Sequence, residues 1–278
     1  MGYVWGKFVI SCFHTYNKNN ASMSQFYNPK RSRNLYDKNK REPYRLSRSK
    51  IELFMKCPRC FYLDRRLGVG QPPGPPFSLN SAVDLLLKKE FDIHRAAGKR
   101  HPMMAAYGVD AIPFAHEKMD EWRDSLGGGI TFLHKPTNFF ITGGVDDVWV
   151  NPQGELIIVD YKATAKASEV SLDAEWQISY KRQMELYQWL FRKNGFNVSP
   201  VGYFVYVNGK LDREAFDGKL EFSVKLIPYD GRDMWIEGVI GKIHACLGGD
   251  ELPDPGPECD FCAYRRAACG LEHGTKPV

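Results

Sequence analysis

The chain has 278 residues, of which 43% are hydrophobic and 13% aromatic, enough for one large domain or two small ones with a buried core. Its net charge of +5 is compatible with a nucleic-acid partner but does not require one. No apolar run approaches the roughly 20 residues of a spanning helix, which excludes a membrane protein. The N-terminal VWGKFVISCF is interrupted by a lysine and lacks a cleavage site, which excludes a signal peptide.

Residues 1–46 are polar and basic and have no apolar periodicity. This composition predicts a disordered, solvated tail. The alternative is a basic arm that contacts phosphates. Met23 is a candidate for the true start of the protein.

We expect order to begin at residue 47, where Ser47 or Ser49 can cap a first helix. A second helix is predicted over 78–98, with Val83, Leu86, Leu87 and Phe91 on its inner face; these follow the helical period only roughly. The segment FAHEKMDEWRD suggests a further helix. After it the sequence pattern changes from helical to strand-like.

Strands are predicted between residues 130 and 159, with a turn at 151–154. A strong amphipathic helix follows and ends at Gly195, a residue type favoured just past a helix C-terminus. Two more strands, PVGYFVYVNG and EFSVKLIPY, precede the helix RDMWIEGVIGKIHACLG. This order of elements predicts an α/β fold, a mixed central sheet flanked by helices, over residues 47–270, with a short tail at 271–278.

A carboxylate–lysine group marks the end of the strand ELIIVDYK. Because side chains alternate along a strand, Asp160 and Lys162 share one face and Tyr161 points the other way. The turn at 151–154 brings Asp146 back beside them. Buried acids need partners or a metal, and hard oxygen ligands suit Mg²⁺ or Mn²⁺. The alternative is a salt bridge at the end of a sheet.

The next helix supplies two more candidates. Gln183 and Tyr187 are four residues apart and therefore lie on one helix face. A right-handed crossover packs this helix back over the sheet near Asp160.

These motifs together resemble a known family. Gly144-Val145-Asp146, then Asp160-Tyr161-Lys162, then the run from Gln183 to Tyr187 resemble the PD-(D/E)XK nuclease superfamily. The order and the CPRCFYL segment are similar to its RecB-like branch, including the CRISPR-associated exonucleases with a cysteine-ligated iron–sulfur cluster. The resemblance covers residues 47–270 and implies a restriction-endonuclease-like core.

The resemblance also implies roles for the site residues. Asp146, Asp160 and the Tyr161 carbonyl would bind the metal ion, and Lys162 would act on the attacking water and on developing charge. Gln183 and Tyr187 would position the lysine and the DNA strand. Members of the branch often carry a histidine ligand in the early helix; here Asp84 stands at that place. We expect Asp84 or Glu90 at the wall of the cleft.

Two CxxC pairs, at opposite ends of the chain, predict a structural metal in a reducing, cytoplasmic compartment rather than disulfides. By the resemblance, Cys57, Cys259, Cys262 and Cys269 would hold a [4Fe-4S] cluster. The alternative set replaces Cys269 with Cys60 and fits Zn²⁺ or a cluster equally well. Either set would join the N-terminal helix to the C-terminal segment.

The sequence therefore predicts a Mg²⁺- or Mn²⁺-dependent DNA nuclease, of exonuclease type, acting in DNA repair, recombination or defence. Its expected substrate is DNA that is single-stranded or has free ends, and a helicase or another DNA-processing protein is an expected partner. Basic side chains that could line the strand path are Arg65, Arg66, Lys181 and Arg182. The alternatives are a non-catalytic nucleic-acid-binding or scaffold module with the same fold, and a zinc-stapled protein-interaction domain.

Overall fold

The computed structural model of the protein describes residues 27–28, 30–74 and 78–273. Its centre is a five-stranded mixed sheet in the order β2-β5-β6-β7-β8, in which only β6 and β7 run parallel. These strands are β2 (Ile112–Pro113), β5 (Asp147–Val150), β6 (Leu156–Thr164), β7 (Val201–Gly209) and β8 (Phe222–Asp230). The predicted α/β fold with a mixed sheet is confirmed.

The central strand β6 is covered on both faces, which explains why its sequence is an almost unbroken apolar run. Ile158 packs in the cluster of side chains that contains Met184 of helix α6. Its neighbours Ile157 and Val159 pack in a second cluster with Phe91 of helix α3. Alternate β6 side chains thus face α6 and α3, so the parity of a β6 residue decides which helix it meets.

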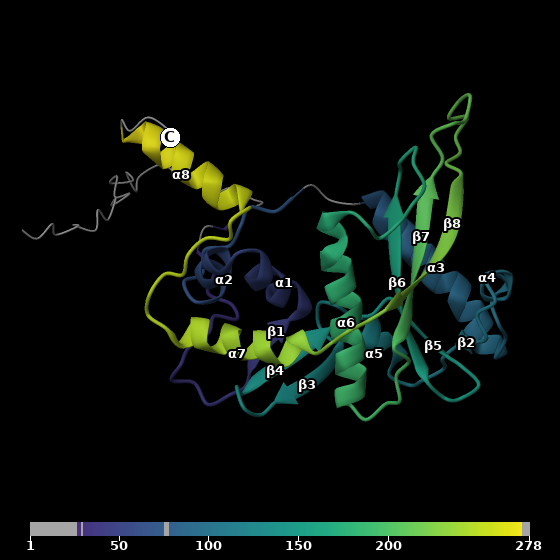
Figure 1. Ribbon diagram of the computed structural model, residues 1–278, viewed down its shortest axis with the longest axis horizontal. Coiled ribbons are helices and arrows are strands. Elements are labelled where there is room, and N and C mark those ends of the chain that lie inside the picture. Colours follow the sequence, from purple (N-terminus) through teal and green to yellow (C-terminus); the bar gives the residue numbers. More distant parts are fainter. Residues whose placement is uncertain (1–26, 29, 75–77, 274–278) are drawn as a thin grey trace, which may run out of the picture.

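Helices flank this sheet, and α6 stands between it and the rest of the molecule (Figure 1). The β6–α6–β7 unit links two neighbouring parallel strands, which requires a crossover helix of this kind. The helices of this part are α3 (Ser78–Ala97), α4 (Pro102–Ala106), α5 (Met119–Arg123), the 3-10 turn η1 (Glu175–Gln177) and α6 (Ile178–Lys193). The α6 helix ends where expected, with Gly195 at a φ of 85°.

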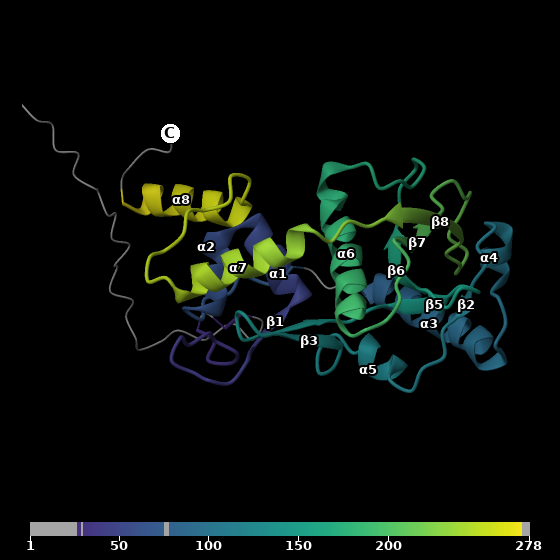
Figure 2. The same ribbon diagram turned by 60° about the horizontal axis from the view of Figure 1, so that its bottom comes forward.

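A second, three-stranded sheet in the order β1-β4-β3 lies on the other side of α6. Its strands are β1 (Tyr44–Ser47), β3 (Ile130–His134) and β4 (Phe139–Gly143). The remaining helices are α1 (Arg48–Lys56), α2 (Pro58–Arg65), α7 (Trp235–Gly248) and α8 (Asp260–Glu272). Figure 2, like Figure 1, places α8 beside α2, although they come from opposite ends of the chain.

Part of the predicted tail lies within the described residues and is packed. Tyr36 and Tyr44 stack edge-to-face on Phe139, and Arg31 pairs with the buried carboxylate of Asp64 at 2.8 Å. Regular structure thus begins at Tyr44, ahead of residue 47. Residues 1–26, including Cys12 and Met23, lie outside the described residues, and the division of the chain into domains stays a prediction.

Two local predictions need correction. Leu87 and Phe91 of α3 are buried, but Leu86 is 62% exposed. Leu87 and Phe91 are four residues apart and share a face, whereas Leu86 lies about 100° around the helix. The helix expected from FAHEKMDEWRD is only five residues long. In the described part of the chain no helix has the length and hydropathy needed to span a membrane.

Candidate active site and metal centre

The predicted acids meet where β5 begins beside β6. Asp147 pairs with Val159 across the two strands, so Asp146 comes opposite the segment Asp160-Tyr161. The carboxylate Oδ2 of Asp146 accepts a hydrogen bond from the backbone N–H of Tyr161 at 2.8 Å. The hairpin turn between the strands, closed by Gly154 N–H on the Asn151 carbonyl at 3.0 Å, sets this register.

Asp160 faces α6 and is fully buried. Its Oδ1 accepts a hydrogen bond from Gln183 Nε2 at 2.8 Å, and its Oδ2 forms an ion pair with the Lys162 ammonium. Gln183 Nε2 also donates to the Tyr187 hydroxyl at 3.1 Å. A Cβ on Gly143 would lie 2.5 Å from the Tyr187 ring, so only glycine lets this ring pack against β4. The structure therefore brings together Asp160, Lys162, Gln183 and Tyr187.

A cavity of about 430 Å³ opens in front of this group. Five residues singled out from the sequence line it: Asp84, Asp146, Tyr161, Lys162 and Gln183. Asp160 and Tyr187 lie behind this wall, where they contact Lys162 and Gln183. Glu90 is not part of the lining; its carboxylate lies 3.0 Å from His101 Nε2.

The charges in the cavity perturb each other. Burial and the neighbouring charge of Asp160 raise the pKa of Asp146 to about 6, against the opposing effect of Lys162 and Lys88. Burial lowers the pKa of Lys162, but the carboxylates of Asp160 and Asp146 outweigh it and hold the pKa above its usual value. Without a bound cation, the site thus holds two acids close together with a protonated lysine between them.

The donor set fits a hard divalent cation. The second oxygen of Asp146, Oδ1, has its nearest ion-pair partner, Lys88 Nζ, at 3.8 Å, which is longer than a hydrogen bond. Oδ2 of Asp160 faces only the Lys162 ammonium among the described residues. Two carboxylate oxygens directed at mobile lysine ammonium groups suit Mg²⁺ or Mn²⁺, which prefer oxygen ligands.

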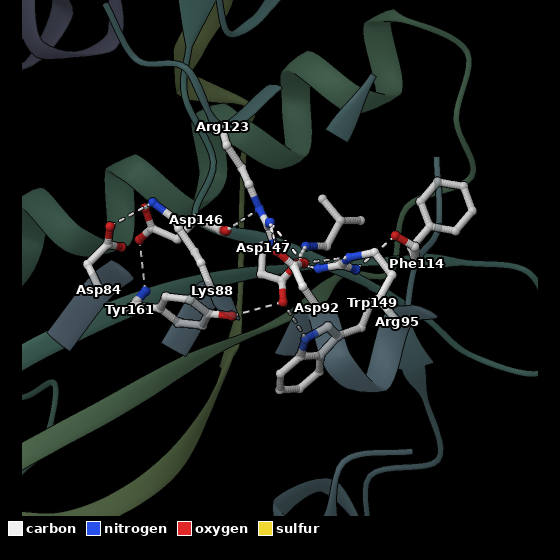
Figure 3. Close-up of polar contacts among 11 residues, drawn as sticks. Asp84, Lys88, Asp92, Arg95, Phe114, Arg123, Asp146, Asp147, Trp149 and Tyr161 are labelled. Carbon is white, nitrogen blue, oxygen red and sulfur yellow. Dashed lines mark hydrogen bonds and ion pairs between the residues drawn. The ribbon is translucent and has the colours of Figure 1, made fainter. Parts of the chain in front are cut away.

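A second buried acid, Asp147, is the site feature that the sequence analysis missed. Its Oδ1 pairs with Arg95 and with Arg123 at 3.1 Å, and its Oδ2 accepts from the Tyr161 hydroxyl at 2.8 Å and the Trp149 indole at 3.3 Å (Figure 3). Strand alternation was the available signal: Asp147 must point to the face opposite Asp146, toward α3, where a buried charge needs partners.

Arg123 connects this network to the predicted metal ligand. Its Nε donates to the backbone carbonyl of Asp146 at 3.1 Å, and its Nη1 bonds both carboxylate oxygens of Asp92 at 2.9 Å. The residue before Asp146, Val145, donates its N–H to the Trp122 carbonyl at 3.0 Å. The short helix α5 therefore holds the backbone that carries Asp146.

The basic residues expected along the strand path lie elsewhere. Arg65 is 5% exposed and bonds the Asp64 carboxylate, and Arg182 pairs with Glu52 at 3.3 Å. Arg66 and Lys181 are likewise absent from the cavity lining. The basic side chains that do line the cavity, besides Lys162, are Arg48, Lys88 and Arg123.

The terminal cysteines form a second centre. The sulfur of Cys57 lies 3.7 Å from that of Cys262, and the sulfur of Cys60 lies 3.6 Å from those of Cys259 and Cys262. All four sulfurs lie within 4.8 Å of one another. The predicted joining of the N-terminal and C-terminal segments by cysteines is confirmed.

Local structure favours a thiolate at Cys57, whereas burial raises the pKa of the Cys60 and Cys262 thiols. Cys57 and Cys259 are the N-caps of α2 and α8, and helix N-termini favour thiolates. Burial raises the pKa of Cys57, but N–H donors from Gly256 and Cys60 outweigh it and bring the pKa to about 7. A Cβ on Gly256 would lie 2.0 Å from the Lys56 carbonyl, so glycine is required for this approach.

The group consists of Cys57, Cys60, Cys259 and Cys262, the members of the alternative set, and Cys269 is not among them. Cys269 lies three turns along α8, and Cys246 lies on α7, partly buried against the main core.

Comparisons with known proteins identify the family of the chain. The sequence model of the PD-(D/E)XK nuclease superfamily matches residues 45–270. A crystal structure of the protein SSO0001 is 16% identical in sequence, with a TM-score of 0.40, and the match covers 84% of this chain and 86% of that one. No curated protein matches the sequence. Because the family match spans both the carboxylate–lysine site and the cysteine centre, the chain belongs to the PD-(D/E)XK nuclease superfamily.

Proposed function

We propose that the protein is a Mg²⁺- or Mn²⁺-dependent DNA nuclease that hydrolyses phosphodiester bonds in the cavity between α3 and α6. The observation that carries the proposal is that Asp146 and Lys162 line one cavity wall, with Asp160 buried directly behind it and bonded to Lys162 and Gln183. A simple salt bridge at a sheet end would not require a second acid with a raised pKa at the same place.

Each side chain has a task in the proposed reaction. Asp146, Asp160 and the Tyr161 carbonyl hold the cation, which when bound supplies Lewis-acid polarisation of a phosphoryl oxygen. Lys162 stays protonated beside the acids and stabilises the negative charge that grows on the phosphoryl group. Gln183 fixes the Asp160 carboxylate by one hydrogen bond, and Tyr187 fixes the Gln183 amide by another.

The proposed substrate is DNA that is single-stranded or has free ends. A cavity of about 430 Å³ is the size of a small-molecule pocket and has room for one phosphodiester and its neighbours. An unwound substrate implies a helicase or a similar DNA-processing partner. An exonuclease mode, a role in repair, recombination or defence, and a cytoplasmic location stay predictions.

At the cysteine centre we propose a single Zn²⁺. Four sulfurs at about 2.3 Å from one tetrahedral ion lie about 3.8 Å apart. Three of the six separations here are 3.6–3.7 Å, and all four sulfurs lie within 4.8 Å of one another. In a [4Fe-4S] cluster each cysteine binds a different iron, which spreads the sulfurs farther apart. The geometry therefore favours one ion over the cluster that the family resemblance implied.

The nuclease proposal is tested by incubating labelled single-stranded DNA with the purified protein and Mg²⁺ or Mn²⁺. We expect metal-dependent cleavage that a chelator abolishes and that Asp146→Asn loses. The control is Asp173→Asn, an exposed acid between β6 and α6, which should cleave normally. DNA binding without cleavage under any of these conditions would instead support the non-catalytic binding module.

A further inference from the structure

Helix α3 brings a second lysine to the cavity, one that belongs to none of the recognised motifs. The Lys88 ammonium lies 2.8 Å from Asp84 Oδ2 and 3.8 Å from Asp146 Oδ1 (Figure 3). It reaches this place because Leu87, beside it, is buried against the sheet and turns Lys88 toward the cavity rim. The side chain is 20% exposed, so a ligand in the cavity can reach it.

Three other cations line the cavity, Lys162, Arg123 and Arg48, and the first two are already engaged. Lys162 pairs with Asp160, and the Arg123 guanidinium is shared between Asp92, Asp147 and a backbone carbonyl. In the described part of the chain the one hydrogen bond of the Lys88 ammonium goes to Asp84. An ammonium has three N–H donors, so Lys88 keeps two for a ligand.

Asp84 in turn is engaged with Lys88. It precedes Lys88 by one helical turn, and its Oδ2 accepts a hydrogen bond from the Lys88 ammonium at 2.8 Å. If Asp84 were to bind the divalent cation through Oδ2, it would give up this bond, and through either oxygen it would bring the cation close to the Lys88 ammonium. The contact therefore suits Asp84 as the residue that positions the Lys88 ammonium better than as a metal ligand.

We propose that Lys88 binds a phosphate oxygen of the DNA backbone at the active site, and that Asp84 is a positioning residue for Lys88 rather than a metal ligand. The assignment rests on the proposed function for its context, but the contact itself requires only a phosphodiester in the cavity. It gives the α3 helix a different task from the histidine ligand that the family resemblance implied at this place.

Two effects of opposite sign follow from the position of Lys88. The ammonium attracts a DNA phosphate, so its removal weakens DNA binding. It also lies 3.8 Å from an oxygen of Asp146 and repels a cation bound there, so its removal strengthens metal binding. A lysine with a purely structural role would not shift these two affinities in opposite directions.

The test uses the full chain with Lys88→Gln, Lys88→Arg and Asp84→Asn, and Lys89→Gln as the matched control. Lys89 is the next residue and is exposed. Binding of a single-stranded oligonucleotide is measured in a chelator, where no cleavage occurs, across a series of salt concentrations. Binding of Mn²⁺ alone is measured by calorimetry, and melting temperatures verify that each variant is folded.

We expect Lys88→Gln to weaken oligonucleotide binding about tenfold and to lower the slope of log K against log salt by about 0.7, the loss of one phosphate contact. Its Mn²⁺ affinity should rise several-fold. Lys88→Arg and Lys89→Gln should keep wild-type oligonucleotide binding, and Asp84→Asn should keep its Mn²⁺ affinity within about threefold.

Two results would overturn the assignment. One is unchanged oligonucleotide binding by Lys88→Gln. The other is a tenfold or greater loss of Mn²⁺ affinity in Asp84→Asn, which would identify Asp84 as a ligand. Neither measurement depends on cleavage, so a wild-type protein that binds DNA through Lys88 but never cuts it would reject the proposed nuclease and leave this phosphate contact in place.

Discussion

Removal of the metal from the cysteine centre should destabilise the whole domain. The centre joins sulfurs that are 199 to 205 positions apart in the chain. In the loop-closure treatment of cross-links, a closed loop of this length stabilises the folded state by about 5 kcal/mol. For a domain of this size, each kcal/mol corresponds to about 2–4 °C, so the melting temperature should fall by about 10–20 °C.

The structure also indicates which part of the domain should lose its structure first when the metal is removed. Among the residues that the structure describes, Cys262 is the one buried residue of α8, so the cysteine centre is the buried contact of this helix. The segment before it keeps two contacts that need no metal: Arg59 Nε on the Pro253 carbonyl at 2.8 Å and the Tyr62 hydroxyl on the Gly249 carbonyl at 3.0 Å. We therefore expect α8 to become sensitive to proteolysis first, at a lower temperature than global unfolding.

The perturbation is Cys259→Ser, and Cys246→Ser is the control because Cys246 lies outside the centre. Metal content is measured by elemental analysis, and stability by thermal melts with and without a zinc chelator. We expect about one zinc per chain in the wild type, its loss in Cys259→Ser, and a chelator effect only where zinc is present. Equal melting temperatures for the two variants would refute the claim that the cysteine centre stabilises the domain. A brown protein rich in iron would refute the proposal of a single Zn²⁺.

Four further predictions concern the carboxylates. Because the pKa of Asp146 is raised to about 6 by burial and by Asp160, Mg²⁺ affinity should rise about tenfold per pH unit up to 6 and level off above 7 in calorimetric titrations, whereas a flat profile would contradict the ligand role. By the same shift, the free energy of unfolding of the metal-free protein should fall by about 3 kcal/mol as pH rises from below 4 through 6. The reason is that Asp146 keeps its proton to a higher pH in the folded state than in the unfolded state. Arg123→Gln and Arg95→Gln each remove one guanidinium from Asp147 and should lower the stability by similar amounts. Only Arg123→Gln should weaken Mg²⁺ binding, because only Arg123 contacts the Asp146 backbone. Equal Mg²⁺ affinities of the two variants would show that α5 does not position Asp146. Asp147→Asn leaves these guanidinium groups without their buried carboxylate and should cost about 3–5 kcal/mol in urea denaturation, and a loss below 1 kcal/mol would contradict the network.

The parts of the site that sequence could predict are those set by local geometry. Asp160 and Lys162 share a strand face because they are two residues apart, and Gln183 and Tyr187 share a helix face because they are four apart. The convergence of Cys57 with Cys259 was predictable because each CxxC is an incomplete metal site that needs a second pair.

The parts that sequence could not predict depend on how distant elements are placed. Helix α3 has two apolar stripes, one with Leu87 and Phe91 and one with Leu86, and only the position of the sheet decides which is buried. The contact of Lys88 with Asp146 depends on the same placement. Strand β1, with the mixed sequence YRLS, gains its structure from pairing with β4 about 95 positions later and has no pattern of its own.

Single-turnover cleavage of single-stranded DNA by Lys162→Ala tests the central claim most directly. The account predicts a loss of about 10²–10³ in rate with DNA binding retained, because the lysine stabilises charge that develops only during the reaction. Lys166→Ala, four residues along the same chain segment, should cleave at the wild-type rate. Folded Lys162→Ala protein that cleaves as fast as Lys166→Ala would contradict the assignment of this site as the catalytic centre.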